Sequence, residues 1–84
     1  YARLGEVKKA IEHYQQALKI SREIRDKQGE GNRLGNLGLA YARLGEVKKA
    51  IEHYQQALDI FTQIESPNAE QVKQLLNKLQ QPKS

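Results

Sequence analysis

Apolar residues recur every three or four positions along most of the chain, which is the spacing of one face of an α-helix. The pattern is clearest over residues 46–64, at Val47, Ala50, Ile51, Tyr54, Ala57, Leu58, Phe61 and Ile64. The spacing predicts long helices over 6–25 and 46–64, a shorter helix over 30–43 and a last helix over 67–80. We expect residues 1–4 to be the tail of a preceding helix. No strand pattern is found, so the sequence predicts an all-α protein.

A block of residues is duplicated within the chain. Residues 1–18, with the sequence YARLGEVKKAIEHYQQAL, recur letter for letter as residues 41–58, so the period from Tyr1 to Tyr41 is 40 residues. Self-similarity at a fixed period is typical of repeat arrays, in which each repeat is one supersecondary unit that packs on its neighbours. The duplication therefore predicts an α-solenoid of antiparallel helix pairs.

Glycines and a Ser-Pro pair mark the expected ends of these helices. Gly5 and Gly45 each follow a leucine, and we expect both to adopt the left-handed backbone conformation that commonly ends a helix. Residues 26–29 are expected to link the first long helix to the shorter one. Ser66 and Pro67 are expected to start the last helix, because Ser is a good N-cap and Pro suits the first helical position.

The last predicted helix is apolar on one side and polar on the other. Its apolar residues are Val72, Leu75, Leu76 and Leu79, and its polar residues are Gln71, Lys73, Gln74, Asn77 and Lys78. This pattern is typical of a helix that closes a repeat array. We therefore expect one segment over 1–84, which consists of a partial first repeat at 1–25, a second repeat at 29–64 and a capping helix at 66–81.

The residues around the second repeat resemble the tetratricopeptide signature W-x-x-L-G-x-x-Y … A-x-x-x-F. The matching residues are Leu34, Leu37, Gly38, Tyr41, Gly45, Ala50, Tyr54 and Ala57, with Leu in place of the Trp and Tyr in place of the Phe. The 40-residue period is longer than the usual 34. It resembles the repeats of the LGN/Pins and kinesin light chain type and the arrays that accompany bacterial NTPases. The resemblance implies a non-enzymatic protein–protein interaction module that binds an extended peptide or a helix in a concave groove.

The resemblance also implies which residues would face that groove. With Leu34, Leu37 and Tyr41 in the core, the open face of the helix over 30–43 carries Asn32, Gly35, Asn36, Leu39 and Arg43, and Arg3 is the earlier copy of Arg43. An Asn side chain can both donate to and accept from a peptide backbone, and an Arg can form a forked bond to a carboxylate. The alternative is that Asn36 bonds within the scaffold and that Arg43 is a solvated cation at a helix end.

Composition and spacing argue against several other kinds of chemistry. The chain has no cysteine, and no apolar run approaches the ~18 residues of a membrane span. The four glycines over 29–38 lack the spacing of a phosphate-binding loop and follow no strand. His13 and His53 are one repeat apart, too far to share a zinc ion with bonds of about 2 Å, and we expect both to be exposed. We expect no catalysis, metal, cofactor or membrane contact, and a cytoplasmic location.

Nucleic acid is the second partner class considered. The formal net charge is +4, and the lysine pairs at 8–9 and 48–49 could attract phosphate. The aromatic residues occupy predicted core positions, which leaves none to stack on bases. Nucleic-acid binding is therefore disfavoured.

Association between copies is a third hypothesis. The chain begins without Met and in the middle of the motif, so we expect it to be the C-terminal part of a longer array. The inner side of the first long helix would then be partly uncovered at Val7, Ile11, Tyr14 and Leu18. Since roughly three repeats are usually needed for stability, we expect homo-oligomers formed by repeat stacking or helix exchange. The alternative to a ligand-binding function is a purely structural or self-associating segment.

Overall fold

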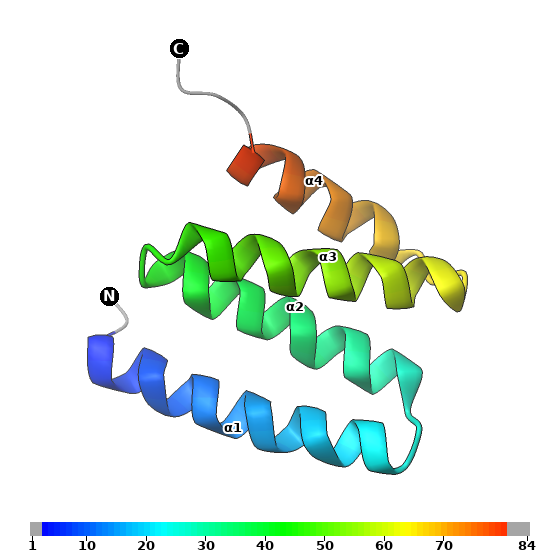
Figure 1. Cartoon of the computed structure of the whole chain (residues 1–84), viewed down its shortest axis with the longest axis horizontal. Coiled ribbons are helices and arrows are strands. Elements are labelled where there is room, and N and C mark those ends of the chain that lie inside the picture. The colour runs from blue at the N-terminus through cyan, green and yellow to red at the C-terminus, as the bar shows by residue number, and fades with distance from the viewer. Residues whose placement is uncertain (1–2, 81–84) are drawn as a thin grey trace.

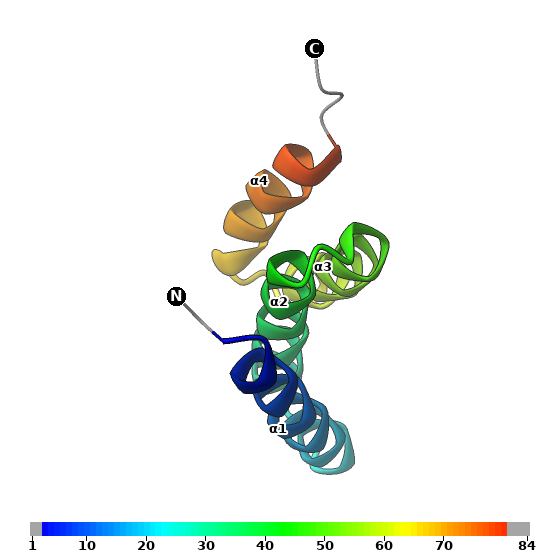
Figure 2. The same ribbon diagram turned by 90° about the vertical axis from the view of Figure 1, so that its left-hand side faces the viewer.

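The computed structural model describes residues 3–80, which form four helices. In chain order they are α1 (Leu4–Glu23), α2 (Lys27–Arg43), α3 (Val47–Gln63) and α4 (Asn68–Gln80). Each helix runs antiparallel to the one before it, and the extensive contacts join consecutive helices (Figure 1). Seen from the side, the helices follow one another in a row from α1 to α4 (Figure 2). The predicted all-α fold of antiparallel helix pairs is confirmed for the described part of the chain.

The helices α2 and α3 are equally long, with 17 residues each, so the expected distinction between a shorter and a longer helix is wrong. The cause is the start of α2. Asp26 is the N-cap, and its Oδ1 accepts a hydrogen bond of 3.0 Å from the backbone N–H of Gly29. This bond satisfies one of the free donors at the helix start. Residues 27–29, expected to belong to a linker, therefore form the first turn of α2.

The start of α4 follows the prediction more closely. The Oγ of Ser66 accepts a hydrogen bond of 3.2 Å from the N–H of Asn68, the first residue of the helix. Pro67 precedes that residue, so its lack of an N–H leaves no internal bond of the helix unmade. The predicted capping role of Ser66 is confirmed, with the helix beginning one residue later than expected.

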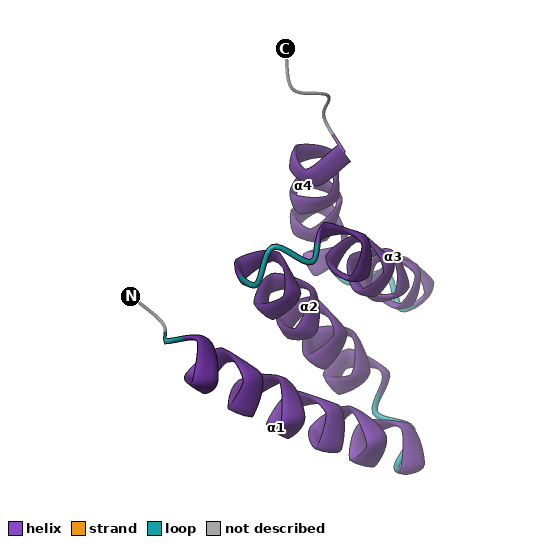
Figure 3. Ribbon diagram, turned by 60° about the vertical axis from the view of Figure 1, so that its left-hand side comes forward, coloured by secondary structure: helices purple, strands orange, loops and turns teal. Residues whose placement is uncertain are grey.

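The loops between the helices are drawn in teal in Figure 3. The three turns that they contain share one backbone geometry. The residue at each turn has a positive φ, which is 59° at Arg25, 79° at Gly45 and 55° at Glu65. In each turn the following N–H reaches back five residues along the chain, in the bonds Asp26 N to Ser21 O, Glu46 N to Tyr41 O and Ser66 N to Phe61 O. Together with the positive φ, these bonds define a Schellman helix end. The prediction for Gly45 is confirmed, whereas two of the three turns place an ordinary residue at the strained position.

Identical Leu-Gly-Glu sequences adopt different structures in the two copies of the repeated block. Residues 44–46 form a turn, but residues 4–6 form the start of α1. The left-handed conformation expected at Gly5 and the helix tail expected at residues 3–4 are therefore wrong; residues 1–2 lie outside the described part. Arg3 is extended, with φ −69° and ψ 144°, and its carbonyl accepts from the N–H of residues 6 and 7. No helix precedes Leu4 in the described residues. The first Leu-Gly-Glu segment therefore has no preceding helix whose carbonyl groups could accept the hydrogen bonds of a helix end.

The core follows α2, which is held between α1 and α3. Leu34 and Leu37 are the largest side chains that are completely buried. Two glycines of α2 allow the close approach of α3. A Cβ atom would stand 2.5 Å from Phe61 Cε1 if placed on Gly31, and 2.7 Å from Tyr54 Cδ1 if placed on Gly38. Both distances are shorter than ordinary Cβ contacts, so a side chain at either position would require the facing ring or the helix to move.

The two ends of the row differ in how their apolar faces are covered. On α4, Val72 and Leu76 are buried and the predicted polar residues are exposed, as the amphipathic pattern requires. On α1, the prediction of partly exposed Val7, Ile11 and Leu18 is wrong, because these residues pack into the core. The exposed large apolar residues of α1 and its end are Leu4, Ile20 and Ile24, and Tyr14 is half-buried.

None of the described helices combines the length and the hydropathy that a bilayer crossing requires.

Candidate functional site

A groove crosses the face of α2 that points away from the core residues Leu34 and Leu37. Its first part is a hollow of about 210 Å³ between α2 and α4. Its walls carry Asn32, Gly35, Asn36 and Leu39 from α2, and Asn68, Gln71, Val72 and Leu75 from α4. The rings of Tyr54 and Phe61, from α3, contribute to the lining. The hollow thus combines amide and apolar side chains on its walls with two aromatic rings.

The second part of the groove is a hollow of about 120 Å³ between α1 and α2. It is lined by Glu6, Val7, Ala10 and Tyr14 from α1, and by Asn36, Leu39, Ala40 and Arg43 from α2. Asn36 and Leu39 belong to both hollows. The two hollows therefore meet at these residues, and we call them together the α2 groove.

The structure brings five of the six residues predicted from the sequence to this groove. Asn32, Gly35, Asn36, Leu39 and Arg43 line one or both hollows. Arg3 does not line either hollow, because it is the exposed N-cap residue of α1. The spacing along the helix was enough to predict that the five α2 residues share one face. Arg3 does not occupy the place that Arg43 has, because the backbone differs between the two copies of the block.

The two asparagines of the groove differ in their hydrogen bonds. The Oδ1 of Asn32 accepts a bond of 3.3 Å from the Nε2 of Gln28, one turn earlier on the same helix. Among the side-chain hydrogen bonds within residues 3–80, none involves Asn36. The amide of Asn36 is half-buried and keeps both its donor and acceptor groups for a ligand.

Gly35 leaves the groove open at the middle of α2. A Cβ placed on this residue would meet no other atom within 4 Å, in contrast to the crowded Gly31 and Gly38. Gly35 is therefore not required for helix packing. Its effect is to lower the groove wall beside Asn36 and Leu39.

Tyr54 and Arg43 are coupled electrostatically at the groove. Burial raises the pKa of the Tyr54 phenol above its ordinary value of 10.0, since the charged phenolate is poorly solvated there. The positive charge of Arg43 lowers the pKa and partly offsets this effect.

The contribution of α4 to the groove was missed by the sequence reasoning, which placed Gln71 on the polar outside of the capping helix. Asn68, Gln71 and Leu75 follow one another at steps of three and four, along one edge of the apolar face of α4. That spacing shows that they share an edge. Which edge faces α2 depends on how α4 crosses α3, and the sequence holds no signal for that angle.

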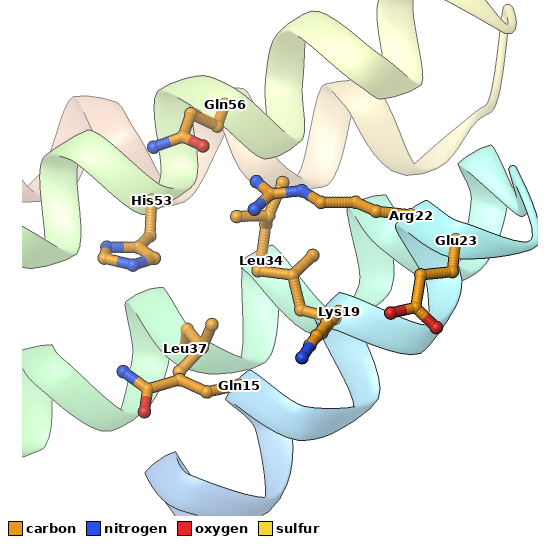
Figure 4. A pocket seen from close by; sticks show the side chains of 9 residues that line it. Gln15, Lys19, Arg22, Glu23, Leu34, Leu37, His53 and Gln56 are labelled. Carbon is orange, nitrogen blue, oxygen red and sulfur yellow. The ribbon is translucent and has the colours of Figure 1, made fainter.

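A larger hollow, of about 570 Å³, lies on the opposite face of α2, between α1 and α3 (Figure 4). Gln15, Lys19, Arg22, His53 and Gln56 surround it, and Leu34 and Leu37 lie at its base. The Nε of Arg22 is 3.2 Å from Oε2 of Glu30, so one cation of this hollow is already paired.

The two histidines do not occupy equivalent surroundings. His13 is exposed as predicted, but the prediction is wrong for His53, which is half-buried. The His53 ring lies 4.9 Å from the Tyr41 ring, and its Nδ1 is 2.7 Å from the Lys49 carbonyl oxygen. Within the described residues, no group of three His, Cys, Asp or Glu side chains is placed to hold a metal ion.

Antiparallel helices stacked in a row, with a groove along one face, define an α-helical repeat protein. Comparison with family models gives the same class: the model of the tetratricopeptide repeat matches residues 1–63, three quarters of the 84 residues. The chain belongs to the tetratricopeptide repeat family. Comparison with curated proteins and with solved structures gives no significant match. Repeats of this family are protein-interaction modules that are typically non-enzymatic.

Proposed function

We propose that this chain is a protein-interaction module that holds an extended peptide or a helix in the α2 groove. The observation that carries the proposal is the position of Asn36. Its amide lies where the two hollows meet and makes no hydrogen bond within residues 3–80. A half-buried amide with free donor and acceptor groups is suited to a peptide backbone, which offers one N–H and one C=O per residue.

The neighbouring residues give the ligand its remaining contacts. Gly35 lets the ligand backbone approach α2 closely, and the exposed side chain of Leu39 offers an apolar contact on the ridge between the hollows. Arg43 forms a forked bond to a carboxylate of the ligand. The preferred ligand is therefore a peptide with an apolar side chain beside a free backbone segment and an acidic group toward the α1 end.

The small size of the groove limits the affinity. Its hollows of about 210 and 120 Å³ are both smaller than the ~300 Å³ at which small-molecule pockets begin. A peptide would bury few of its side chains here. We expect dissociation constants in the micromolar range or weaker, on the order of 8 kcal/mol of binding free energy or less.

The experiment is selection of binders from a displayed library of random peptides, followed by affinity measurement of one selected peptide by fluorescence anisotropy. Asn36→Ala and Arg43→Ala are expected to weaken binding at least fivefold each, because the first removes the backbone contact and the second the carboxylate contact. Lys48→Ala, at an exposed site outside the groove, is the matched control and should leave binding unchanged. Unchanged binding in both groove variants would end the proposal.

Three expectations from the sequence stay predictions. They are a cytoplasmic location, weak or absent nucleic-acid binding and association between copies. A segment that only closes an array is the alternative function, and it predicts that the library yields no peptide whose binding depends on Asn36.

A further inference from the structure

Two hollows of the molecule are lined by the same positions of the repeated block. The hollow of about 570 Å³ between α1 and α3, which we call the α1–α3 hollow, is lined on its α1 side by residues that include Gln15, Leu18 and Lys19. A hollow of about 390 Å³ between α3 and α4, the α3–α4 hollow, is lined on its α3 side by Gln55, Leu58 and Asp59. Each of these residues follows its counterpart by 40 positions, so the duplication supplies an internal comparison of the two hollows.

The charges of the two hollows differ from the position at which the copies of the block diverge. Residues 1–18 and 41–58 are identical, and the next residue is Lys19 in one copy and Asp59 in the other. The charged residues that line the α1–α3 hollow are two cations and one anion, Lys19, Arg22 and Glu23. Those that line the α3–α4 hollow are one of each sign, Asp59 and Lys73. The lining of the α1–α3 hollow therefore has an excess of positive charge that the other hollow lacks.

The two cations of the α1–α3 hollow keep groups for a ligand. The Nε of Arg22 is 3.2 Å from Oε2 of Glu30, which orients the side chain and leaves the N–H donors of its terminal nitrogens. Glu30 is shared with Lys27, whose Nζ is 3.7 Å from Oε1, so it does not neutralise both cations. Lys19 takes part in no ion pair within residues 3–80. An anion that enters the hollow can therefore pair with both Lys19 and Arg22.

The α3 wall of this hollow offers polar groups. Figure 4 shows the guanidinium of Arg22 reaching from α1 toward His53 and Gln56 of α3. The Nδ1 of His53 is 2.7 Å from the Lys49 carbonyl oxygen, which can only accept, so Nε2 is the ring nitrogen left for a ligand. The side chain of Gln56 makes no hydrogen bond to another side chain or to the backbone in the described part of the chain. Both side chains can therefore bond to a peptide backbone.

The floor of the hollow adds little apolar contact. Leu34 and Leu37 line it, but they are only 0% and 1% exposed. A ligand at this place is held by charge and hydrogen bonds, because there is little apolar surface left for it to cover.

We infer that the α1–α3 hollow is a second binding site, which takes an acidic segment of a partner polypeptide. Carboxylates of the segment pair with Lys19 and Arg22 through charge-assisted hydrogen bonds. Its backbone bonds to Gln56 and His53, because each of its residues offers an N–H and a C=O. The site lies on the face of α2 opposite the α2 groove, so it does not depend on Asn36. The three helices that enclose it, α1, α2 and α3, all lie within the described residues.

Other anionic partners fit this hollow less well. A nucleic acid is held by a track of cations along its phosphates and by aromatic rings that stack on its bases. The lining here has only two Lys or Arg side chains, beside Glu23, and no Phe, Tyr or Trp ring. A second copy of this chain offers no acidic segment, since no two of its Asp or Glu residues are adjacent in the sequence.

The test is an NMR titration of the isotope-labelled 84-residue chain with a short peptide of alternating glutamate and alanine, at about 150 mM salt. Saturable shifts of the backbone amides are expected at Lys19, Arg22, His53 and Gln56. A peptide of alternating glutamine and alanine should produce none of them. Lys19→Asp should weaken binding by about fivefold or more, because an attraction becomes a repulsion. Lys19 is exposed, so this variant is expected to fold.

Lys8→Asp is the matched control, because it makes the same change of charge at an exposed site of α1 outside the hollow. It should change the affinity less than about twofold. Asn36→Ala should leave binding unchanged, which separates this site from the α2 groove. The inference is overturned if no saturable shifts occur at the hollow, or if Lys8→Asp weakens binding as much as Lys19→Asp. Loss of binding in Asn36→Ala overturns it too, and so does stronger binding of a thymidine oligonucleotide at the same residues.

Discussion

Gly38 of α2 packs directly against the ring of Tyr54 on α3, at a distance that leaves no space for a Cβ atom. A glycine inside a helix costs about 1 kcal/mol relative to alanine, so this contact is the reason for its presence. Gly38→Ala is expected to lower the free energy of unfolding by about 1–3 kcal/mol, because Tyr54 or the whole helix must move. Urea denaturation followed by circular dichroism measures the change.

Gly35, one turn earlier on the same helix, is the matched control. A Cβ there meets nothing within 4 Å, so Gly35→Ala should raise the free energy of unfolding by up to about 1 kcal/mol. The same change raises the wall of the α2 groove and should weaken a selected peptide. If the two alanine variants changed stability equally and in the same direction, the close contact would not be the cause.

Two turns carry a side chain where the backbone favours glycine. Arg25 and Glu65 have φ values of 59° and 55°, and Gly45 occupies the equivalent place in the middle turn. Arg25→Gly and Glu65→Gly are each expected to stabilise the fold by about 0.5–1 kcal/mol, since glycine adopts this conformation without a Cβ penalty. Gly45→Arg should destabilise it by a similar amount. Melting temperatures of the three variants check the prediction, and a loss of stability in both glycine variants would contradict it.

The free energy of unfolding is expected to fall at alkaline pH because of the Tyr54 phenol. Burial raises the pKa of this phenol above 10.0 in the folded state, so the folded protein keeps its proton at pH values where the unfolded chain has lost it. The contribution is therefore fully present below pH 10.0 and is lost as the pH rises through the folded-state pKa. Urea midpoints measured across this range should fall.

The Tyr54→Phe variant separates this effect from the titration of other groups. It has no phenol proton at this site, so its midpoint should fall less steeply than that of the unchanged protein above pH 10.0. Tyr14→Phe, at the equivalent position of the first copy, should leave the Tyr54 contribution in place. Equal slopes for the unchanged protein and Tyr54→Phe would contradict the assignment.

Periodicity was enough to predict that four helices form and which face of α2 is buried. The steps of three and four that include Leu34 and Leu37 identified the core side of α2, and the same helix phase placed Asn36 and Leu39 on the opposite side. Local pattern determines these features because side chains on one helix face must share one environment.

Features that depend on neighbouring helices were not accessible in this way. Leu-Gly-Glu is a turn at 44–46 and a helix start at 4–6, so its conformation depends on whether a preceding helix supplies carbonyl acceptors. His53 is half-buried beside the ring of Tyr41. Among the described residues, no tyrosine occupies the corresponding place beside His13. The role of Gln71 in the groove depends on the crossing of α3 and α4.

The most direct test of the proposed function is a map of backbone amide chemical shifts, recorded by NMR while a library-selected peptide is added. We predict that the largest shifts lie along the α2 groove, at Asn32, Asn36 and Leu39 and across it at Gln71. Shifts confined to the outer lysines of α1 and α3, such as Lys8 and Lys48, with none at Asn36, would contradict the account.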